Sequence, residues 1–136
     1  MNFKKAWRGV FALLAVFITW QTLTPDPDTT EPSIAIARFI AELLFHDQRF
    51  ADKVAHFLAY AALGGSAAFG ELRIAGRRLF AAIALAAYGC ALEFLQGLGG
   101  VRVAEFADAA ANSLGVVASF ASVLFIESLN MRKRHA

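Results

Sequence analysis

Four long apolar stretches limit the folds open to this chain more than any other feature of its sequence. A helix needs roughly 20 predominantly apolar residues to cross the hydrocarbon core of a bilayer, and each stretch comes close to that length. We therefore expect an all-α integral membrane protein, a four-helix bundle in a single domain that covers residues 1–136. The predicted spans are about residues 6–23, 51–70, 79–96 and 105–126.

The composition favours membrane spans over a large soluble core. Apolar residues make up 58% of the chain and charged residues 18%, whereas ordinary soluble domains are about 45–50% apolar and about 25% charged. The mean hydropathy is +0.53, and the apolar excess lies in runs. The net charge is only +2, and the basic residues gather at the chain ends and in one loop, so we expect no nucleic-acid partner.

The first apolar stretch resembles a signal peptide, because Lys4, Lys5 and Arg8 precede most of it. No small-x-small cleavage motif follows, and the chain instead runs into Pro25 and Pro27. Proline removes a backbone hydrogen-bond donor and so ends a helix. We therefore expect an uncleaved first helix that stops at this proline pair, with removal of the segment as the alternative.

The basic residues between the spans predict the orientation. They fall nine to one side and four to the other, which accounts for all 13. The side richer in Lys and Arg faces the cytoplasm, so both termini are expected in the cytoplasm and the loops near residues 24–50 and 97–104 outside. The nine are Lys4, Lys5, Arg8, Arg73, Arg77, Arg78, Arg132, Lys133 and Arg134, and the four are Arg38, Arg49, Lys53 and Arg102.

An amphipathic segment separates the first two spans. Residues 29–33 have the character of a helix start, and apolar residues then recur at helical spacing over about residues 33–47. The segment is too short to span a membrane. We expect an interfacial helix that lies on the outer leaflet, with a lid over the mouth of the bundle as the alternative. The apolar positions are Ile36, Phe39, Ile40, Leu43 and Leu44.

Three polar clusters interrupt the apolar stretches at the start of the second span, the end of the third and the start of the fourth. Ionisable groups inside or beside a membrane span are costly and indicate a functional site. The second and fourth spans enter from outside and the third leaves toward it, so all three clusters share the outer third of the membrane. The predicted binding site comprises Asp52, Lys53, His56, Tyr60, Glu93, Gln96, Arg102, Asp108 and Asn112.

This mixture of charges predicts recognition of a lipid head group. Lys53 and Arg102 supply cations, and the guanidinium fork of arginine matches phosphate. Asp52, Glu93 and Asp108 supply carboxylates, and Asp52 is also expected to act as the N-cap of its helix. A polar notch in the outer leaflet suits the phosphate or sugar end of a lipid whose tail stays in the bilayer. The expected partner is therefore a membrane lipid or a lipid-linked intermediate, and the sequence leaves protein partners unknown.

Other interpretations of the same residues stay open. His56, Glu93 and Asp108 are candidate catalytic residues, because a histidine paired with a carboxylate can act as a general acid or base. They are also a conceivable metal-ligand group, but there is no His-x-x-x-His and no cysteine pair, so we expect no metal and no cofactor. Alternatively, the charges form an ion-pair network that only locks the bundle.

The motifs resemble those of the VanZ-like family of small integral membrane proteins, over about residues 10–126. The resemblance implies a bacterial cytoplasmic (inner) membrane protein that acts at the cell-envelope face. The founding member of the family is associated with resistance to the glycopeptide teicoplanin, and no biochemical activity is established for it. The family often has a further glycine where Ser119 stands here. The motifs are Asp52-Lys53-Val54-Ala55-His56-Phe57-Leu58-Ala59-Tyr60, Glu93-x-x-Gln96 and Arg102-x5-Asp108-x3-Asn112-x-x-Gly115.

Three functions therefore compete. The first is the binding or handling of an anionic lipid or a lipid-linked glycan head group, which the resemblance associates with glycopeptide resistance. The second is a membrane-embedded hydrolase or transferase acting on a lipid-linked substrate. The third is a structural membrane scaffold without a ligand. Whether the chain is an enzyme is left undecided by the sequence.

Overall fold

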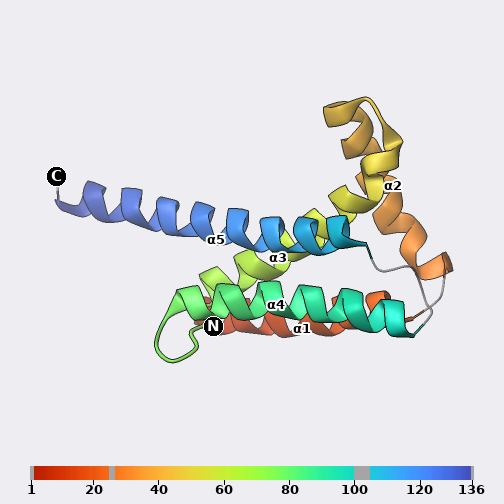
Figure 1. The fold of residues 1–136 in the computed structure, drawn as a ribbon. Coiled ribbons are helices and arrows are strands. Elements are labelled where there is room, and N and C mark those ends of the chain that lie inside the picture. Colours follow the sequence, from red (N-terminus) through yellow and green to blue (C-terminus); the bar gives the residue numbers. More distant parts are fainter. Residues whose placement is uncertain (1, 25–26, 100–104, 136) are drawn as a thin grey trace.

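The computed structural model describes residues 2–24, 27–99 and 105–135, and this part of the chain contains helices and no strand. Arg102 of the predicted site lies outside the described residues. The described ranges contain five α-helices and one short 3-10 helix, and Figure 1 shows how the helices are arranged. Their bounds are Phe3–Leu23 (α1), Pro27–Phe45 (α2), Gln48–Phe50 (η1), Ala51–Phe69 (α3), Arg78–Leu98 (α4) and Phe106–His135 (α5).

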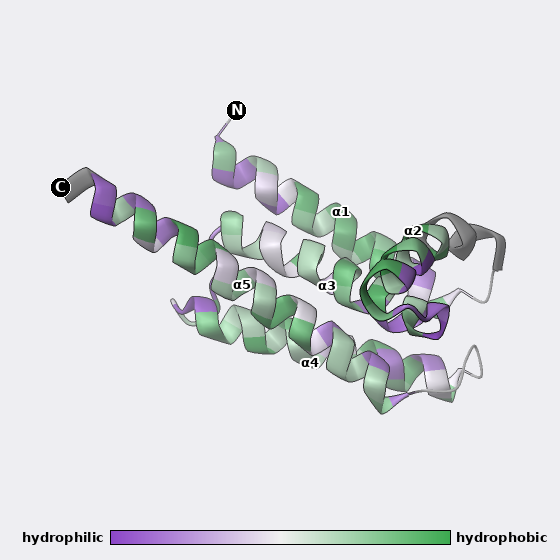
Figure 2. Ribbon diagram, turned by 90° about the horizontal axis from the view of Figure 1, so that it is seen from above, coloured by the Kyte–Doolittle hydropathy of each residue, from purple (hydrophilic) through white to green (hydrophobic). Residues whose placement is uncertain are grey.

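Helix α3 lies at the centre of the arrangement. It contacts α1, α2, α4 and α5, and its most extensive contact is with α5. Helices α1, α4 and α5 run lengthwise beside α3, whereas α2 lies at one end of the molecule next to the start of α3 (Figures 1 and 2). We call this end the α2 end. It also holds the end of α4 and the beginning of α5 (Figure 1).

Three helices are long and apolar enough to cross a membrane: α1, α4 and the Phe106–Lys133 part of α5. Large apolar side chains on all three face away from the protein, among them Leu13, Phe94 and Val117. Figure 2 shows green, apolar residues along the middle of these helices and purple, hydrophilic residues mainly near their ends. Exposed apolar surface on this scale is suited to lipid rather than to water. The chain is therefore a membrane protein.

The second predicted span, α3, is not among these three helices. Asp52, Lys53 and His56 occupy its first two turns and lower its hydropathy. Its 19 residues are comparable in length to the other spans, and much of its second half is buried. The all-helical fold thus agrees with the prediction, whereas the membrane bundle of four helices stays a prediction.

Glycines allow α3 to approach α5 and α4 closely. A Cβ at Gly115 would collide with the carbonyl oxygen of Phe57. A Cβ at Gly89 would lie 2.8 Å from the Tyr60 ring and 3.0 Å from the Cβ of Asn112. Small residues permit such close packing between membrane helices. The approach brings polar side chains from three helices together at the α2 end.

Helix α2 begins at Pro27, earlier than the predicted start near residues 29–33. Proline is favourable in the first turn, where its missing N–H has no partner within the helix. Ala37 and Ala41 form the buried side of α2 and pack with Ala51 and Val54 of α3. Larger apolar side chains of α2 face away from the protein, namely Ile36, Phe39, Leu43 and Leu44.

Ion pairs connect the helices at the end opposite to α2. Glu71, which follows α3, lies 2.7 Å from Lys4 Nζ and 3.3 Å from Arg78 Nη2. Arg78 Nη1 in turn lies 2.6 Å from Glu127 Oε2 of α5. The hydrogen bond from Lys4 holds the pKa of the Glu71 carboxyl below its ordinary value. This second group of charges joins α1, the α3–α4 connection and α5.

Candidate functional site

Seven polar side chains from α3, α4 and the beginning of α5 contact one another at the α2 end. Charged groups are costly to bury unless they are paired and hydrogen-bonded, and here each member makes an ion pair or hydrogen bond with another. Six of the seven are residues of the predicted site. We call this group the α2-end cluster: Asp52, Lys53, His56, Glu93, Glu105, Asp108 and Asn112.

Lys53 is surrounded by carboxylates. Its Nζ lies 2.6 Å from Asp108 Oδ1 and 3.3 Å from Asp52 Oδ2. It also lies 2.5 Å from Glu105 Oε2. Asp108 is only 1% exposed, whereas Lys53 is 26% exposed. The ammonium therefore compensates a buried carboxylate from a position near the surface, and its charge is engaged within the protein.

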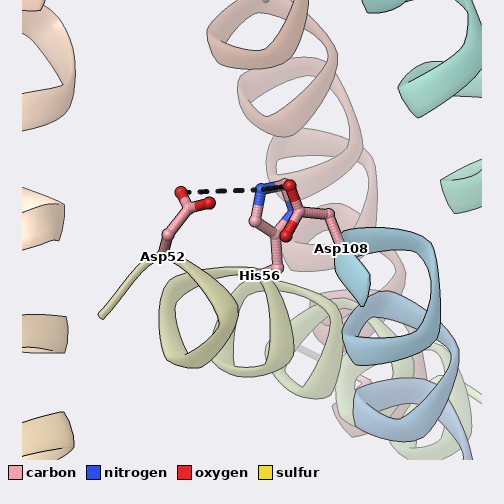
Figure 3. A group of neighbouring side chains, drawn as sticks. All are labelled: Asp52, His56 and Asp108. Carbon is pink, nitrogen blue, oxygen red and sulfur yellow. Dashed lines mark ion pairs between the residues drawn. The ribbon is translucent and has the colours of Figure 1, made fainter. Parts of the chain in front are cut away.

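His56 has polar neighbours at both ring nitrogens. On one side, Nδ1 lies 3.0 Å from Asn112 Oδ1 and 3.3 Å from Glu93 Oε1. On the other side, Nε2 lies 3.8 Å from Asp108 Oδ2 and 4.0 Å from Asp52 Oδ1. Figure 3 shows the imidazole between the Asp52 and Asp108 carboxylates. The ring thus connects α3 with both α4 and α5.

Asn112 indicates which nitrogen of His56 carries a proton. Its Nδ2 donates a hydrogen bond to Glu93 Oε1 at 3.3 Å, so its Oδ1 is the atom that faces His56 Nδ1. Both neighbours of Nδ1 are then acceptors, and Nδ1 acts as the donor. A neutral His56 consequently holds its lone pair on Nε2, on the side of the two aspartates.

The two aspartates divide their oxygens between Lys53 and His56. Asp52 turns Oδ2 toward Lys53 and Oδ1 toward His56. Asp108 turns Oδ1 toward Lys53 and Oδ2 toward His56. One carboxylate oxygen of each aspartate therefore lies near the Nε2 side of the imidazole and is not the atom paired with the ammonium.

Negative charge predominates in the cluster. Four carboxylates accompany one lysine, so the described members carry a net charge of −3 with a neutral His56 and −2 with a protonated one. Glu93 and Asp108 are almost fully buried, where an uncompensated charge is strongly unfavourable. The buried carboxylates therefore need cationic or hydrogen-bond-donating partners, and Lys53 and Asn112 are two of them.

The expectation that Asp52 caps its helix is wrong. Phe50 is the residue at the cap of α3, it makes no side-chain cap bond, and Asp52 lies in the first turn. Asp47 is the capping residue of the preceding η1, where its side chain accepts a hydrogen bond from the Arg49 backbone N–H at 2.9 Å. Asp52 is still favourably placed, because the N-terminal turn of a helix attracts negative charge.

Two described residues of the predicted site, Tyr60 and Gln96, are not part of the α2-end cluster. Tyr60 is buried, and its hydroxyl has no hydrogen-bond partner among the described residues. Gln96 is buried near the end of α4, and within the described ranges it makes no hydrogen bond or ion pair with a cluster member. Arg102 lies outside the described residues.

Glu105 is a cluster member that the sequence motifs did not indicate. It comes one residue before α5, is 47% exposed and contacts Lys53. Its spacing from Asp108 was the available signal, because side chains three residues apart lie on one side of a helix. Glu105, Asp52 and Lys53 form the accessible edge of the cluster. A separate pocket beside α2 has no cluster member in its lining, which consists of Phe39, Glu42, Leu43 and His46.

The geometry suits three kinds of chemistry. Carboxylate oxygens at the accessible edge can accept hydrogen bonds from the hydroxyl groups of a ligand. An imidazole between carboxylates can transfer a proton as a general acid or base. Imidazole and carboxylate groups together can also bind a divalent cation.

Comparisons of the chain with protein-family models, with curated proteins and with solved structures found no match.

Proposed function

We propose that the chain is a multi-pass protein of the bacterial cytoplasmic membrane, of the VanZ-like kind, in which α3 crosses the bilayer with α1, α4 and α5. A helix of 19 residues is roughly 28 Å long at 1.5 Å per residue, close to the hydrocarbon thickness of about 30 Å. In its first two turns, Lys53 and His56 pair with Asp108 of α5, and His56 also pairs with Glu93 of α4. Both termini lie in the cytoplasm in this arrangement, and the α2 end faces outward.

We further propose that α2 lies in the outer interface of the membrane. Its small residues Ala37 and Ala41 pack against α3, so its larger apolar side chains are directed away from the protein. A helix with such a face binds at the boundary between head groups and acyl chains. This position brings the α2-end cluster to the depth of the lipid head groups.

The function that this arrangement supports best is the binding of a lipid-linked head group at the α2-end cluster. The observation that carries the proposal is the convergence of Lys53 and His56 of α3 with buried Asp108 of α5 at one end of an apolar molecule. The engagement of Lys53 by three carboxylates favours a hydroxyl-bearing glycan over a bare phosphate. Phosphate recognition would depend on Arg102, in the connection between α4 and α5. Handling of a cell-wall intermediate in this way would account for a link to glycopeptide resistance.

Lipid mass spectrometry on gently purified protein tests this proposal. We expect a co-purifying lipid-linked glycan or anionic lipid with the wild type, and at least about tenfold less with Asp108→Asn, a difference of about 1.4 kcal/mol. Glu71→Gln at the opposite end is the matched control and should retain the lipid. Equal recovery from Asp108→Asn, Arg102→Ala and the wild type would exclude head-group binding at this cluster.

A second candidate function is hydrolysis or group transfer on the same lipid-linked substrate. It is favoured by the position of His56, which has Glu93 near Nδ1 and Asp108 near Nε2. A histidine that is held by a hydrogen bond at one ring nitrogen can accept or give up a proton at the other ring nitrogen. His56→Gln should abolish turnover and retain lipid binding, and a fully active His56→Gln protein would rule this function out.

A further inference from the structure

We propose that Asp52, His56 and Asp108 form a binding site for a divalent cation, with Zn²⁺ as the best match. The inference rests on the proposed function, since the ion would occupy the cluster that receives the head group. The inference adds a bound metal ion to the proposed function, and the spacing of residues along the chain did not predict this ion.

The geometry of the three side chains is the first support. One ligand atom from each of the three residues lies within 4.8 Å of the others (Figure 3). In a tetrahedral zinc site with bonds of about 2.0–2.2 Å, ligand atoms are roughly 3.3–3.6 Å apart. The observed separations of 3.8 and 4.0 Å from His56 Nε2 are slightly larger, so small side-chain rotations would close the group around an ion.

The orientation of His56 is an independent support. A metal-binding histidine commonly donates its other ring N–H to a carboxylate or carbonyl group, which fixes the tautomer. His56 does this through Nδ1, which has Asn112 Oδ1 at 3.0 Å and Glu93 Oε1 at 3.3 Å. Its Nε2 is therefore left with a lone pair directed to the side where carboxylate oxygens lie. A neutral imidazole nitrogen of this kind is a common metal ligand.

Lys53 is compatible with an ion in this position. It pairs with Oδ2 of Asp52 and Oδ1 of Asp108, whereas the opposite oxygens of these residues lie toward His56. The ammonium can thus stay in place as a neighbour that orients both carboxylates.

The donor set indicates the class of metal. One imidazole nitrogen and two carboxylate oxygens suit Zn²⁺ better than Mg²⁺ or Ca²⁺, which prefer oxygen ligands alone. Three protein ligands leave a fourth tetrahedral position for water or for an oxygen of a bound molecule. Asp52 lies at the accessible edge of the cluster, where such an oxygen could arrive.

Zinc binding by the intact, tag-free protein in detergent tests the inference. The protein is treated with EDTA, dialysed against Zn²⁺ and measured by elemental mass spectrometry. We expect about one Zn²⁺ per chain, as for a site with three protein ligands. Asp108→Asn and His56→Gln should each lower the affinity at least about 10–100-fold, the range found even for second-shell changes at metal sites.

Matched controls separate this site from adventitious binding. Asp47→Asn removes a partly exposed carboxylate outside the cluster, and His46→Gln and His135→Gln remove the other two histidines of the chain. All three controls should bind Zn²⁺ as the wild type does. Circular dichroism and gel filtration verify that each variant is folded. Glu93→Gln is a milder change on the Nδ1 side of His56, and we expect it to lower the affinity for Zn²⁺ less.

The outcomes for zinc and for lipid are distinguishable. One Zn²⁺ per chain, bound in a way that depends on Asp108 and His56, supports the metal site even when no lipid is recovered. The absence of lipid would then contradict only the proposed head-group binding. Lipid recovery without zinc in the wild type, or zinc binding equal in wild type and Asp108→Asn, would overturn the metal site while the proposed function stands.

Discussion

His56 Nδ1 lies 3.0 Å from Asn112 Oδ1, although 56 positions separate the two residues in the chain. The contact joins the second turn of α3 to α5 and orients the imidazole. Asn112 is fully buried and also donates to Glu93 of α4. One amide therefore holds together the three helices that form the α2-end cluster.

Replacing Asn112 by leucine should destabilise the protein, because it leaves polar groups of His56 and Glu93 without this partner. A buried polar group that loses its hydrogen bond costs about 1–3 kcal/mol. Unfolding in mixed detergent micelles, followed by circular dichroism, measures the loss. Ser122→Ala is the control, since Ser122 is exposed and bonds only the Ala118 carbonyl oxygen of its own helix. Equal stability of the two variants would contradict a structural role for Asn112.

Replacing Gly115 by alanine should force α3 and α5 apart. The added methyl group would meet the carbonyl oxygen of Phe57, which is backbone and cannot rotate away. Overpacking of this kind typically costs about 1–3 kcal/mol. Gly65→Ala is a matched control on α3, because its Cβ would lie 3.8 Å from the nearest atom, Ser119 Cβ. Thermal stability measured by gel filtration after heating should fall for Gly115→Ala and change little for Gly65→Ala.

Replacing Lys53 by methionine should lower the amount of folded protein. The change removes the positive charge beside Asp108, which is buried. Breaking a fully buried pair costs about 3–5 kcal/mol, and partial exposure of Lys53 reduces this to about 1–3 kcal/mol through screening. A second change, Asp108→Asn, should restore part of the loss in a double-mutant cycle. Additive effects of the two changes would show that the contact contributes little.

Acidification should weaken the end of the molecule opposite to α2. The hydrogen bond from Lys4 lowers the pKa of Glu71 in the folded protein relative to its ordinary value of 4.5. A carboxyl with a lowered folded pKa contributes stability above its unfolded pKa, and that contribution is lost as the pH falls through the folded value. The free energy of unfolding, measured between pH 7 and pH 3, should therefore decline toward pH 3. Glu71→Gln should be less stable at pH 7 and show a shallower decline; an unchanged slope would speak against this contact.

The proposed orientation predicts which side of the membrane each loop occupies. In a background with Cys90 replaced by alanine, a cysteine at Asp47 should react with a membrane-impermeant maleimide added to intact cells. A cysteine at Arg73 should react only after the cells are opened. Labelling of both positions from outside would indicate that α3 does not cross the bilayer.

Local sequence determined the helices and the membrane character of the chain. Hydropathy and spacing depend only on neighbouring residues, so the predicted span at 51–70 corresponds to α3 at Ala51–Phe69 and the one at 79–96 to α4 at Arg78–Leu98. The end of α5 was missed, because its last turns are charged yet continue as helix to His135. The early start of α2 at Pro27 was missed because a proline within a helix suggests a boundary.

The sequence also indicated that polar residues of three helices gather at one depth, but it could not pair their atoms. Helical spacing gives the face on which a side chain lies and not the rotation of the facing helix. Only the tertiary structure decided that Asp52, rather than Glu93, lies with Asp108 on the Nε2 side of His56. The tertiary structure also revealed the ion pair between Lys53 and Glu105. The physical reason is close packing at Gly115 and Gly89, which sets the distance and register between helices that are remote in the chain.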